Sequence, residues 1–165
     1  MDFFEVVKRR KSVRSYSRKE VEKELIEKII DAGRLAATAR NEQPWEFIAV
    51  SDKGILKKIS DICPNGPFIK DASCLITVFS KDTKYYLEDC SAATQNMLLA
   101  IEALGLGGCW VAGDKKGYID EIRKFLNVPS SYKLVSMISL GYPEKPQGPK
   151  PKRDLKDMLH WERFA

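Results

Sequence analysis

Residues 72–79 read Ala-Ser-Cys-Leu-Ile-Thr-Val-Phe, a nearly continuous apolar run. Such a run is typical of a β-strand buried on both faces, because a strand with one solvated face alternates apolar and polar side chains. The turn cluster Pro-Asn-Gly-Pro at 64–67 precedes the run, and a long helical pattern from 83 to 104 follows it. The sequence therefore predicts a sheet with helices on its faces.

The rest of the chain alternates between helical and strand patterns. An apolar stripe of Leu25, Ile29 and Ile30, for example, marks an amphipathic helix over 21–37. With 165 residues the chain fits one domain, 1–165, of the α/β or α+β class. The other expected elements are helices over 3–10, 53–63, 83–104 and 118–126, and strands over 46–51, 72–79, 108–112 and 133–140.

Two features indicate a second copy of the chain. Residues 92–104 are apolar almost all round, so a helix there has to be covered on every side. Residues 142–154 contain four prolines among several basic residues, which predicts an extended arm, and apolar side chains return over 155–164. We expect the arm, residues 143–165, to dock on the other subunit.

Composition narrows the class of partner. The net charge of +5 favours an anionic ligand, but it is too small to indicate nucleic acid when no aromatic residues interleave the basic runs. The four cysteines form no C-x-x-C pair, and a single histidine cannot build a His-rich metal site. The nearly apolar stretch 74–79, interrupted only by Thr77, is far shorter than the roughly 18 residues of a membrane span. Basic residues at 8–11 stand where a signal peptide is apolar. We therefore expect a cytoplasmic protein with core thiols and no metal, membrane or nucleic-acid partner.

The first candidate site is Arg-Lys-Ser-Val-Arg at 10–14, where a helix gives way to extended chain. In extended chain, alternate residues point the same way. Arg10 and Ser12 could therefore bind a phosphate, and Arg14 would reach farther along the ligand. The alternative is a solvated basic surface.

Three further segments are ambiguous on their own. The loop 37–45 contains Asn41 and Gln43, whose side-chain amides can form hydrogen bonds with the amide edge of a ring. The alternative is that the loop is only a helix cap and turn. The glycines of 105–113 allow a flat ligand close to the backbone, or they end a helix; their G-x-G-G spacing after a helix excludes a dinucleotide fingerprint. The basic cluster 149–153 is a second anion contact or a solubilising tail.

Taken together, these segments resemble the nitroreductase family of flavin enzymes. The family opens with R-R-S-[IV]-R, and this chain has RKSVR at 10–14. The family motif [AS]-P-S-x-x-N-x-Q-P-W-x-F is matched by ATARNEQPWEF at 37–47, and its helix A-x-Q-N-M-L-L-A followed by L-G-L-G by residues 93–107. Residues 141–143 and the closing segment around His160 also match short members, so the resemblance spans nearly the whole chain in order.

The resemblance implies a three-layer α+β fold with a central mixed sheet flanked by helices, in an intertwined homodimer with an extended C-terminal arm. It also implies FMN at the dimer interface, with Arg10 and Ser12 on the phosphate and ribityl chain and Arg14 at the edge of the flavin ring. Either Lys152 or Arg153 would close on the phosphate. The implied cofactor-binding set is Arg10, Lys11, Ser12, Arg14, Asn65, Trp110, Val111, Ala112, Gly113, Lys152 and Arg153, with Thr38, Ala39 and Asn41 coming from the other subunit.

The activity implied by the resemblance is that of an FMN-dependent oxidoreductase. NADH or NADPH would give a hydride to flavin N5 and leave, and a small organic acceptor, such as a nitroaromatic or a quinone, would then take its place in a ping-pong cycle. No side-chain acid or base would be required, and Arg14 would tune the flavin. A non-catalytic flavin-binding sensor or carrier on the same fold is the alternative.

The chain departs from the family pattern in two places. The Pro-Ser pair of the second motif is missing, so the hydroxyl contact rests on Thr38, and Ala39 offers only its backbone. Larger members carry an inserted lid between the central strand and the helix, whereas only residues 80–87 fill that space here. The substrate face would then be open or covered by another segment.

Overall fold

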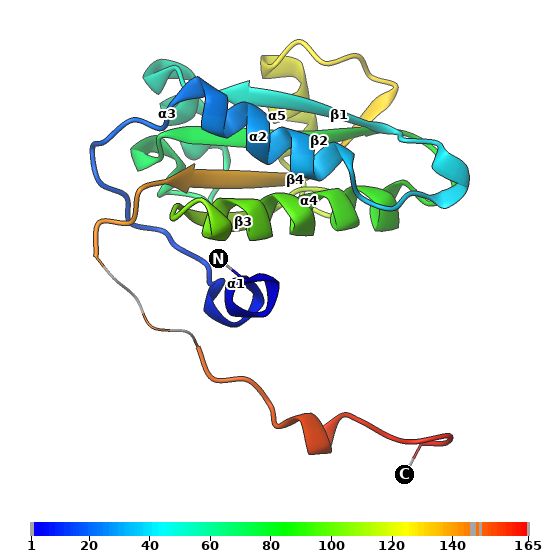
Figure 1. Cartoon of the computed structure of the whole chain (residues 1–165). Coiled ribbons are helices and arrows are strands. Elements are labelled where there is room, and N and C mark those ends of the chain that lie inside the picture. Colours follow the sequence, from blue (N-terminus) through cyan, green and yellow to red (C-terminus); the bar gives the residue numbers. More distant parts are fainter. Residues whose placement is uncertain (1, 146–147, 149, 165) are drawn as a thin grey trace.

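The computed structural model describes residues 2–145, 148 and 150–164. At its centre lies a four-stranded sheet in the order β1-β2-β4-β3, with helices on both faces (Figure 1). The three-layer α+β class is therefore confirmed. The strands are β1 (Trp45–Val50), β2 (Cys74–Lys81), β3 (Gly107–Ala112) and β4 (Tyr132–Gly141). The helices are α1 (Phe3–Arg9), α2 (Lys23–Arg34), α3 (Lys53–Ile62), α4 (Tyr86–Ala103) and α5 (Ile119–Phe125), with short 3-10 turns η1 (Ala39–Asn41), η2 (Ile69–Asp71) and η3 (Leu155–Asp157).

The sheet corrects the expectation of mixed pairing, because every pair of neighbouring strands is antiparallel. Helix α4 carries the chain back along the sheet, so β3 runs in the same direction as β2. Strand β4 pairs with both of them and lies between them. Parallel pairing in the described chain is limited to an isolated bridge between Ser12 and Gly108.

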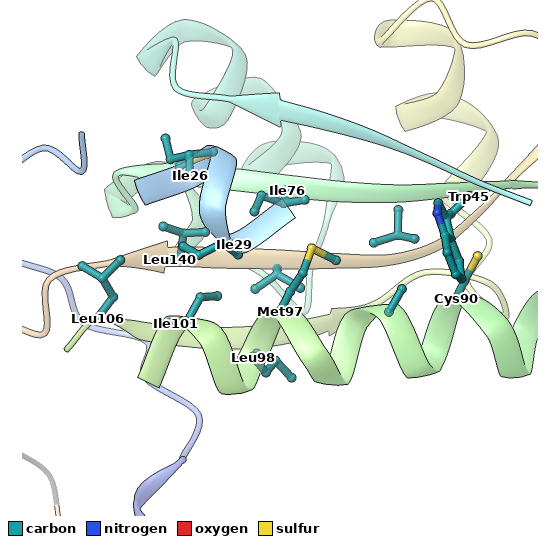
Figure 2. Close-up of a cluster of buried hydrophobic side chains, with 14 of the residues drawn as sticks. Ile26, Ile29, Trp45, Ile76, Cys90, Met97, Leu98, Ile101, Leu106 and Leu140 are labelled. Carbon is teal, nitrogen blue, oxygen red and sulfur yellow. The ribbon is translucent and has the colours of Figure 1, made fainter. Parts of the chain in front are cut away.

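Two hydrophobic cores lie on the two faces of the sheet. Helices α2 and α4 cover one face, where Ile29 and Met97 meet Ile76 of β2 and Leu140 of β4 (Figure 2). Helices α3 and α5 cover the other face. Strand β2 contributes side chains to both cores, so the prediction that residues 72–79 are buried on both faces is confirmed.

Local sequence explains how the helices start and pack. Asp2 accepts a hydrogen bond from the backbone N of Phe4 at 3.2 Å at the start of α1, and Asp52 caps α3 in the same way at 2.9 Å. An added Cβ at Gly33 of α2 would lie 2.8 Å from Cγ of Met97 in α4. The missing side chain therefore lets these two helices approach closely.

Helix α4 is not covered on every side within one chain. Gln95 and Ala103 on its outer face are exposed, and Leu99 and Ala100 are half-buried. The coverage by a second copy that its composition suggests stays a prediction.

The C-terminal segment extends away from the body of the molecule (Figure 1). Among its described residues the regular structure is the single turn η3. Trp161 is 76% exposed and Phe164 is 90% exposed. Large apolar side chains so exposed are consistent with an arm that docks on another surface, which also stays a prediction.

Candidate functional site

A cavity of about 460 Å³ lies beside the C-terminal end of α1. No carboxylate is among its described lining residues, so none of these residues neutralises the cations there. Such a group of cations attracts anions, and guanidinium and ammonium groups bind phosphate oxygens through charge-assisted hydrogen bonds. The cavity brings together four residues that the sequence predicted as one site and adds others; its lining is Val7, Lys8, Arg10, Lys11, Ser12, Arg14, Lys150 and Lys152.

The backbone gives the segment 10–14 its shape. The N–H of Val13 donates to the carbonyl of Gly108 in β3 at 2.9 Å. The Val13 side chain is 1% exposed, so its neighbours on either side point outward, toward the cavity. An added Cβ at Gly107 would lie 2.8 Å from the Val13 side chain. The start of β3 therefore has to lack side chains for the segment to lie against it.

Tyr16 anchors the far end of the same segment. Its hydroxyl lies 2.7 Å from the carbonyl oxygen of Val13 and 2.8 Å from Oγ of Ser139. Burial raises the pKa of Tyr16 above its ordinary value, so the hydroxyl keeps its proton for these hydrogen bonds. The N–H of Ser17 also donates to the carbonyl of Tyr142 at 2.8 Å, which ties the segment to the end of β4.

Arg14 stands between the basic cavity and a second cavity of about 530 Å³. Its guanidinium carbon lies 5.7 Å from the centre of the Phe68 ring, a cation–π arrangement. The second cavity is also basic, through Arg18, Lys19, Lys53 and Lys70, but Asp71 and Glu144 line it as well. These carboxylates offset part of its charge, so the first cavity is the stronger candidate for an anion.

The loop 38–43 lies far from the basic cavity. It joins α2 to β1 at the end of the sheet away from α1 (Figure 1), so a single chain does not bring Thr38, Ala39 and Asn41 to that cavity. Oγ1 of Thr38 donates to Oδ2 of Asp89 at 2.8 Å, and the N–H of Ala39 donates to Oδ1 of Asp89 at 3.0 Å. The first turn of α4 thus holds the loop.

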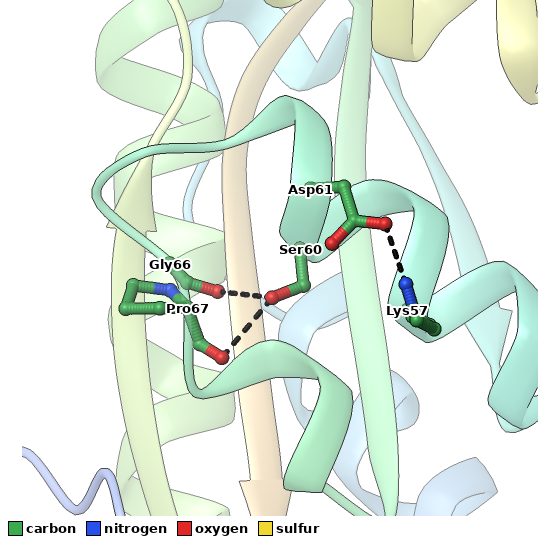
Figure 3. A network of polar contacts seen from close by, with 5 residues as sticks. All are labelled: Lys57, Ser60, Asp61, Gly66 and Pro67. Carbon is green, nitrogen blue, oxygen red and sulfur yellow. Dashed lines mark hydrogen bonds and ion pairs between the residues drawn. The ribbon is translucent and has the colours of Figure 1, made fainter.

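Asn65 lies in the turn that follows α3. The hydroxyl of Ser60 lies 3.2 Å from the carbonyl oxygen of Gly66 and 3.1 Å from that of Pro67, which fixes the turn (Figure 3). Asn65 is exposed and does not line the basic cavity. Its contact with a cofactor stays a prediction.

Trp110, Val111, Ala112 and Gly113 lie in β3 and directly after it. Val111 is 3% exposed and belongs to a core, so only its backbone is available to a ligand, and its contact with a cofactor stays a prediction. An added Cβ at Gly113 would lie 2.9 Å from the carbonyl oxygen of Leu134. Trp110, Val111 and Gly113 are not among the described residues that line the basic cavity in a single chain.

The arm places its two candidate cations differently. Lys152 lines the basic cavity together with Lys150. Arg153 instead donates a hydrogen bond from Nη2 to the backbone carbonyl of Asp157.

Comparison with known proteins gives the family. A model of the nitroreductase family matches residues 7–83 and 64–142. The chain belongs to the nitroreductase family. It is similar to a protein from Methanothermobacter thermautotrophicus described as an NADH dehydrogenase/NAD(P)H nitroreductase, with 38% identity over 172 residues that cover 99% of this chain and 88% of the relative.

Two solved structures of the nitroreductase family extend the comparison. One is an NADH dehydrogenase/NAD(P)H nitroreductase from Bacteroides thetaiotaomicron, with a TM-score of 0.94, 34% identity and 98% coverage of both chains. The other is a nitroreductase from Desulfovibrio desulfuricans in complex with FMN, with a TM-score of 0.86, 26% identity, and coverage of 100% of this chain and 99% of that one. The resemblance seen in the motifs is therefore confirmed for the family and the fold.

Sequence reasoning missed two residues that line the basic cavity, Lys8 and Lys150, and the carboxylate of Asp89 that holds the loop 38–43. Lys8 stands one turn before Lys11, a spacing that could have shown it, and Lys150 lies inside the basic cluster already singled out. Asp89 gave no signal, because an acidic residue in the first turn of a helix is ordinary.

The thiol of Cys109 lies buried behind the cationic segment. Burial raises the pKa of this thiol, while Arg14, Ser12 and Arg10 act in the opposite direction. All four cysteines are buried and free, as expected of core thiols. Within the described chain, no cluster of His, Cys, Asp or Glu could hold a metal ion. Nor does any helix of that part have the length and apolar character to cross a membrane.

Proposed function

We propose that this chain is an FMN-dependent oxidoreductase whose cofactor lies at the interface of a homodimer. The observation that carries the proposal is the basic cavity, whose described lining holds six cations and no carboxylate. A phosphate monoester fits such a donor set. The cavity's volume of about 460 Å³ lies within the range of about 300–1,000 Å³ that is usual for small-molecule sites. The FMN complex of the Desulfovibrio protein supports the choice of anion.

Four residues of the cavity have a specific role in this proposal. Arg10 binds the phosphate through its planar fork, and Ser12 adds a hydroxyl toward the phosphate and ribityl chain. Lys152 closes on the phosphate from the arm, because Arg153 is engaged with the backbone of Asp157. Arg14, at the border of the cavity, reaches the edge of the flavin ring, where its charge stabilises the negative charge that reduction adds.

The redox chemistry belongs to the cofactor. When bound, FMN supplies hydride transfer at N5, from NADH or NADPH to a small organic acceptor such as a nitroaromatic or a quinone, in ping-pong order. The described lining of the basic cavity consists of cations, Ser12 and Val7, so the protein's part is to bind, orient and charge-stabilise rather than to move protons.

The second subunit completes the site. Thr38, Ala39 and Asn41 belong to the loop between α2 and β1, at the end of the sheet away from α1 (Figure 1). They therefore reach a flavin bound in the cavity beside α1 only if a second copy brings them there. A shallow apolar depression of about 390 Å³ between α1, α2 and α4 offers that copy a surface. Phe3 at its rim is 60% exposed.

The visible absorption spectrum of the purified protein tests the cofactor. We expect flavin bands that bleach when NADH or NADPH is added without oxygen, and the donor that bleaches them faster is the preferred one. A colourless protein that does not take up added FMN would overturn the proposal.

Turnover separates an oxidoreductase from a flavin carrier. We expect steady oxidation of NADH or NADPH when a quinone or a nitroaromatic is supplied. Flavin that is bound but is not turned over with any such acceptor would favour a sensor or carrier.

A further inference from the structure

Asp89 is a buried carboxylate in the first turn of α4, only 5% exposed. Both of its oxygens face the loop 38–43, through the 2.8 Å bond from Thr38 Oγ1 and the 3.0 Å bond from the N–H of Ala39. Thr38 Oγ1 in turn accepts a hydrogen bond from the N–H of Gln43 at 3.2 Å. No ion pair of the described residues includes Asp89. A carboxylate buried without a cation needs such hydrogen bonds, aided by the positive end of the helix dipole, to offset its lost hydration.

The loop that Asp89 holds is strained. The backbone φ angles of Arg40, Asn41 and Gln43 are 55°, 58° and 47°, in the left-handed region, and none of these residues is a glycine. Each such residue costs on the order of 1 kcal/mol or more and persists only where its surroundings fix it. The hydrogen bonds to Asp89 tie this strained loop to α4 and so help to keep it from relaxing.

The same bonds decide which groups of the loop remain for a ligand. The hydroxyl proton of Thr38 and the amide proton of Ala39 are both donated to Asp89. The side-chain amide of Asn41 is exposed, and no hydrogen bond to it is found within the described residues. Because that amide can both donate and accept, it is the group through which this loop can bind a ring with an amide edge.

We propose that Asp89 is a positioning residue for the flavin site, although it does not touch the flavin. It sets the loop so that the Asn41 amide of one subunit reaches the edge of a flavin ring held in the cavity of the other. Thr38 and Ala39 attach the loop to Asp89 instead of contacting the cofactor with their own protons. This inference rests on the proposed function and names the residue outside the cavity on which that function depends.

A double-mutant cycle on the dimeric protein tests the proposal, with FMN dissociation constants measured by quenching of flavin fluorescence. We expect Asn41→Ala and Asp89→Ala each to weaken FMN binding by about tenfold, the upper range for one neutral hydrogen bond. The double variant should bind no more weakly than either single variant, because both changes remove the same contact. Additive losses would overturn the proposal, since a general structural role of Asp89 would add to the loss of Asn41.

Glu88→Ala is the matched control, because Glu88 is the exposed acidic neighbour of Asp89 in the same helix turn. It should leave FMN affinity unchanged. Equal affinity of the Glu88→Ala and Asp89→Ala variants would overturn the inference while leaving FMN binding by the unaltered protein intact. Failure of the unaltered protein to bind FMN would instead overturn the proposed function.

If Asp89→Ala does not fold, Thr38→Val takes its place, because this change keeps the side chain's shape and removes only the hydroxyl. We expect weaker FMN binding that is again non-additive with Asn41→Ala, and recovery of affinity in Thr38→Ser. Unchanged affinity in Thr38→Val, or additivity with Asn41→Ala, would overturn the proposal.

Discussion

The cationic segment 10–14 and the loop 38–43 are the two polar regions of the proposed flavin site, and they are held in opposite ways. The segment is fixed by its backbone, through the 2.9 Å bond from Val13 to Gly108. Its charged side chains remain turned toward the cavity. The loop is fixed by a side chain of another element, Asp89, which takes up the loop's own donors. Where the backbone does the holding, the side chains stay available for a ligand.

The difference also predicts how each region responds to substitution. A change of side chain in the segment removes a ligand contact but leaves the local path of the chain in place. A change at Asp89, which is buried against the loop, should alter the path of the whole loop. The segment should therefore show losses of binding without losses of shape, and the loop should show both together.

Arg10→Ala gives the largest expected effect. The Arg10 side chain lines the basic cavity and is engaged in no ion pair of the described chain, so its loss should leave the stability of the flavin-free protein unchanged. FMN affinity should fall by about 1.5–3 kcal/mol, the usual worth of a hydrogen bond to a charged group. Isothermal titration with FMN measures this loss.

Lys28→Ala controls for the loss of one positive charge, because Lys28 is exposed on α2 and outside the cavity. It should bind FMN as the unaltered protein does. A similar weakening by both variants would mean that the net charge of the protein, rather than the cavity, attracts the phosphate.

Gly107→Ala tests whether the segment 10–14 is held by its backbone against β3. The added Cβ would lie 2.8 Å from the Val13 side chain, so the segment and β3 have to move apart. Overpacking of this kind typically costs about 1–3 kcal/mol, and we expect about 2 kcal/mol in the free energy of unfolding by urea, together with weaker FMN binding. Gly117→Ala, where nothing lies within 4 Å of an added Cβ, should change neither quantity. Full stability in Gly107→Ala would show that the segment is not held closely against β3.

The fold could be predicted from sequence as far as it depends on local pattern. The apolar run at 72–79 correctly predicted the strand that is covered on both faces, because such a strand has apolar side chains at consecutive positions. The direction of pairing could not be derived in this way. It depends on β4, far along the chain, taking its place between β2 and β3, and no local pattern encodes that position.

The candidate site shows the same difference between features that follow from local sequence and features that depend on the whole fold. Arg10, Ser12 and Arg14 line one cavity because they are close in sequence and alternate along extended chain. The separation of the loop 38–43 from that cavity could not be read from spacing, because it depends on the arrangement of the whole sheet (Figure 1). Asp89 was missed for the same reason, since its partners lie about 50 residues earlier in the chain.

The smallest expected effect is a change in the labelling rates of two buried thiols, Cys109 behind the segment 10–14 and Cys90 beside Asp89. Cys109 lies behind the cationic segment, where Arg14 lowers a pKa that burial raises. Arg14→Ala should therefore raise the pKa of Cys109 further, reduce its thiolate fraction at about pH 9, and slow its labelling by iodoacetamide. The change should be well under tenfold, because Arg14 is exposed and water screens its charge.

Cys90 follows Asp89 on α4, and burial raises the pKa of its thiol to about 11, with the Asp89 carboxylate raising it as well. Removing that negative charge in Asp89→Asn should lower the pKa of Cys90 and speed its labelling, the opposite sign to the effect of Arg14→Ala on Cys109. Mass spectrometry of the labelled peptides follows both thiols in the same sample, so each is the control for the other. If either substitution changed both thiols alike, the two regions would be opening together, and the contrast between a segment held by backbone and a loop held by one carboxylate would fail.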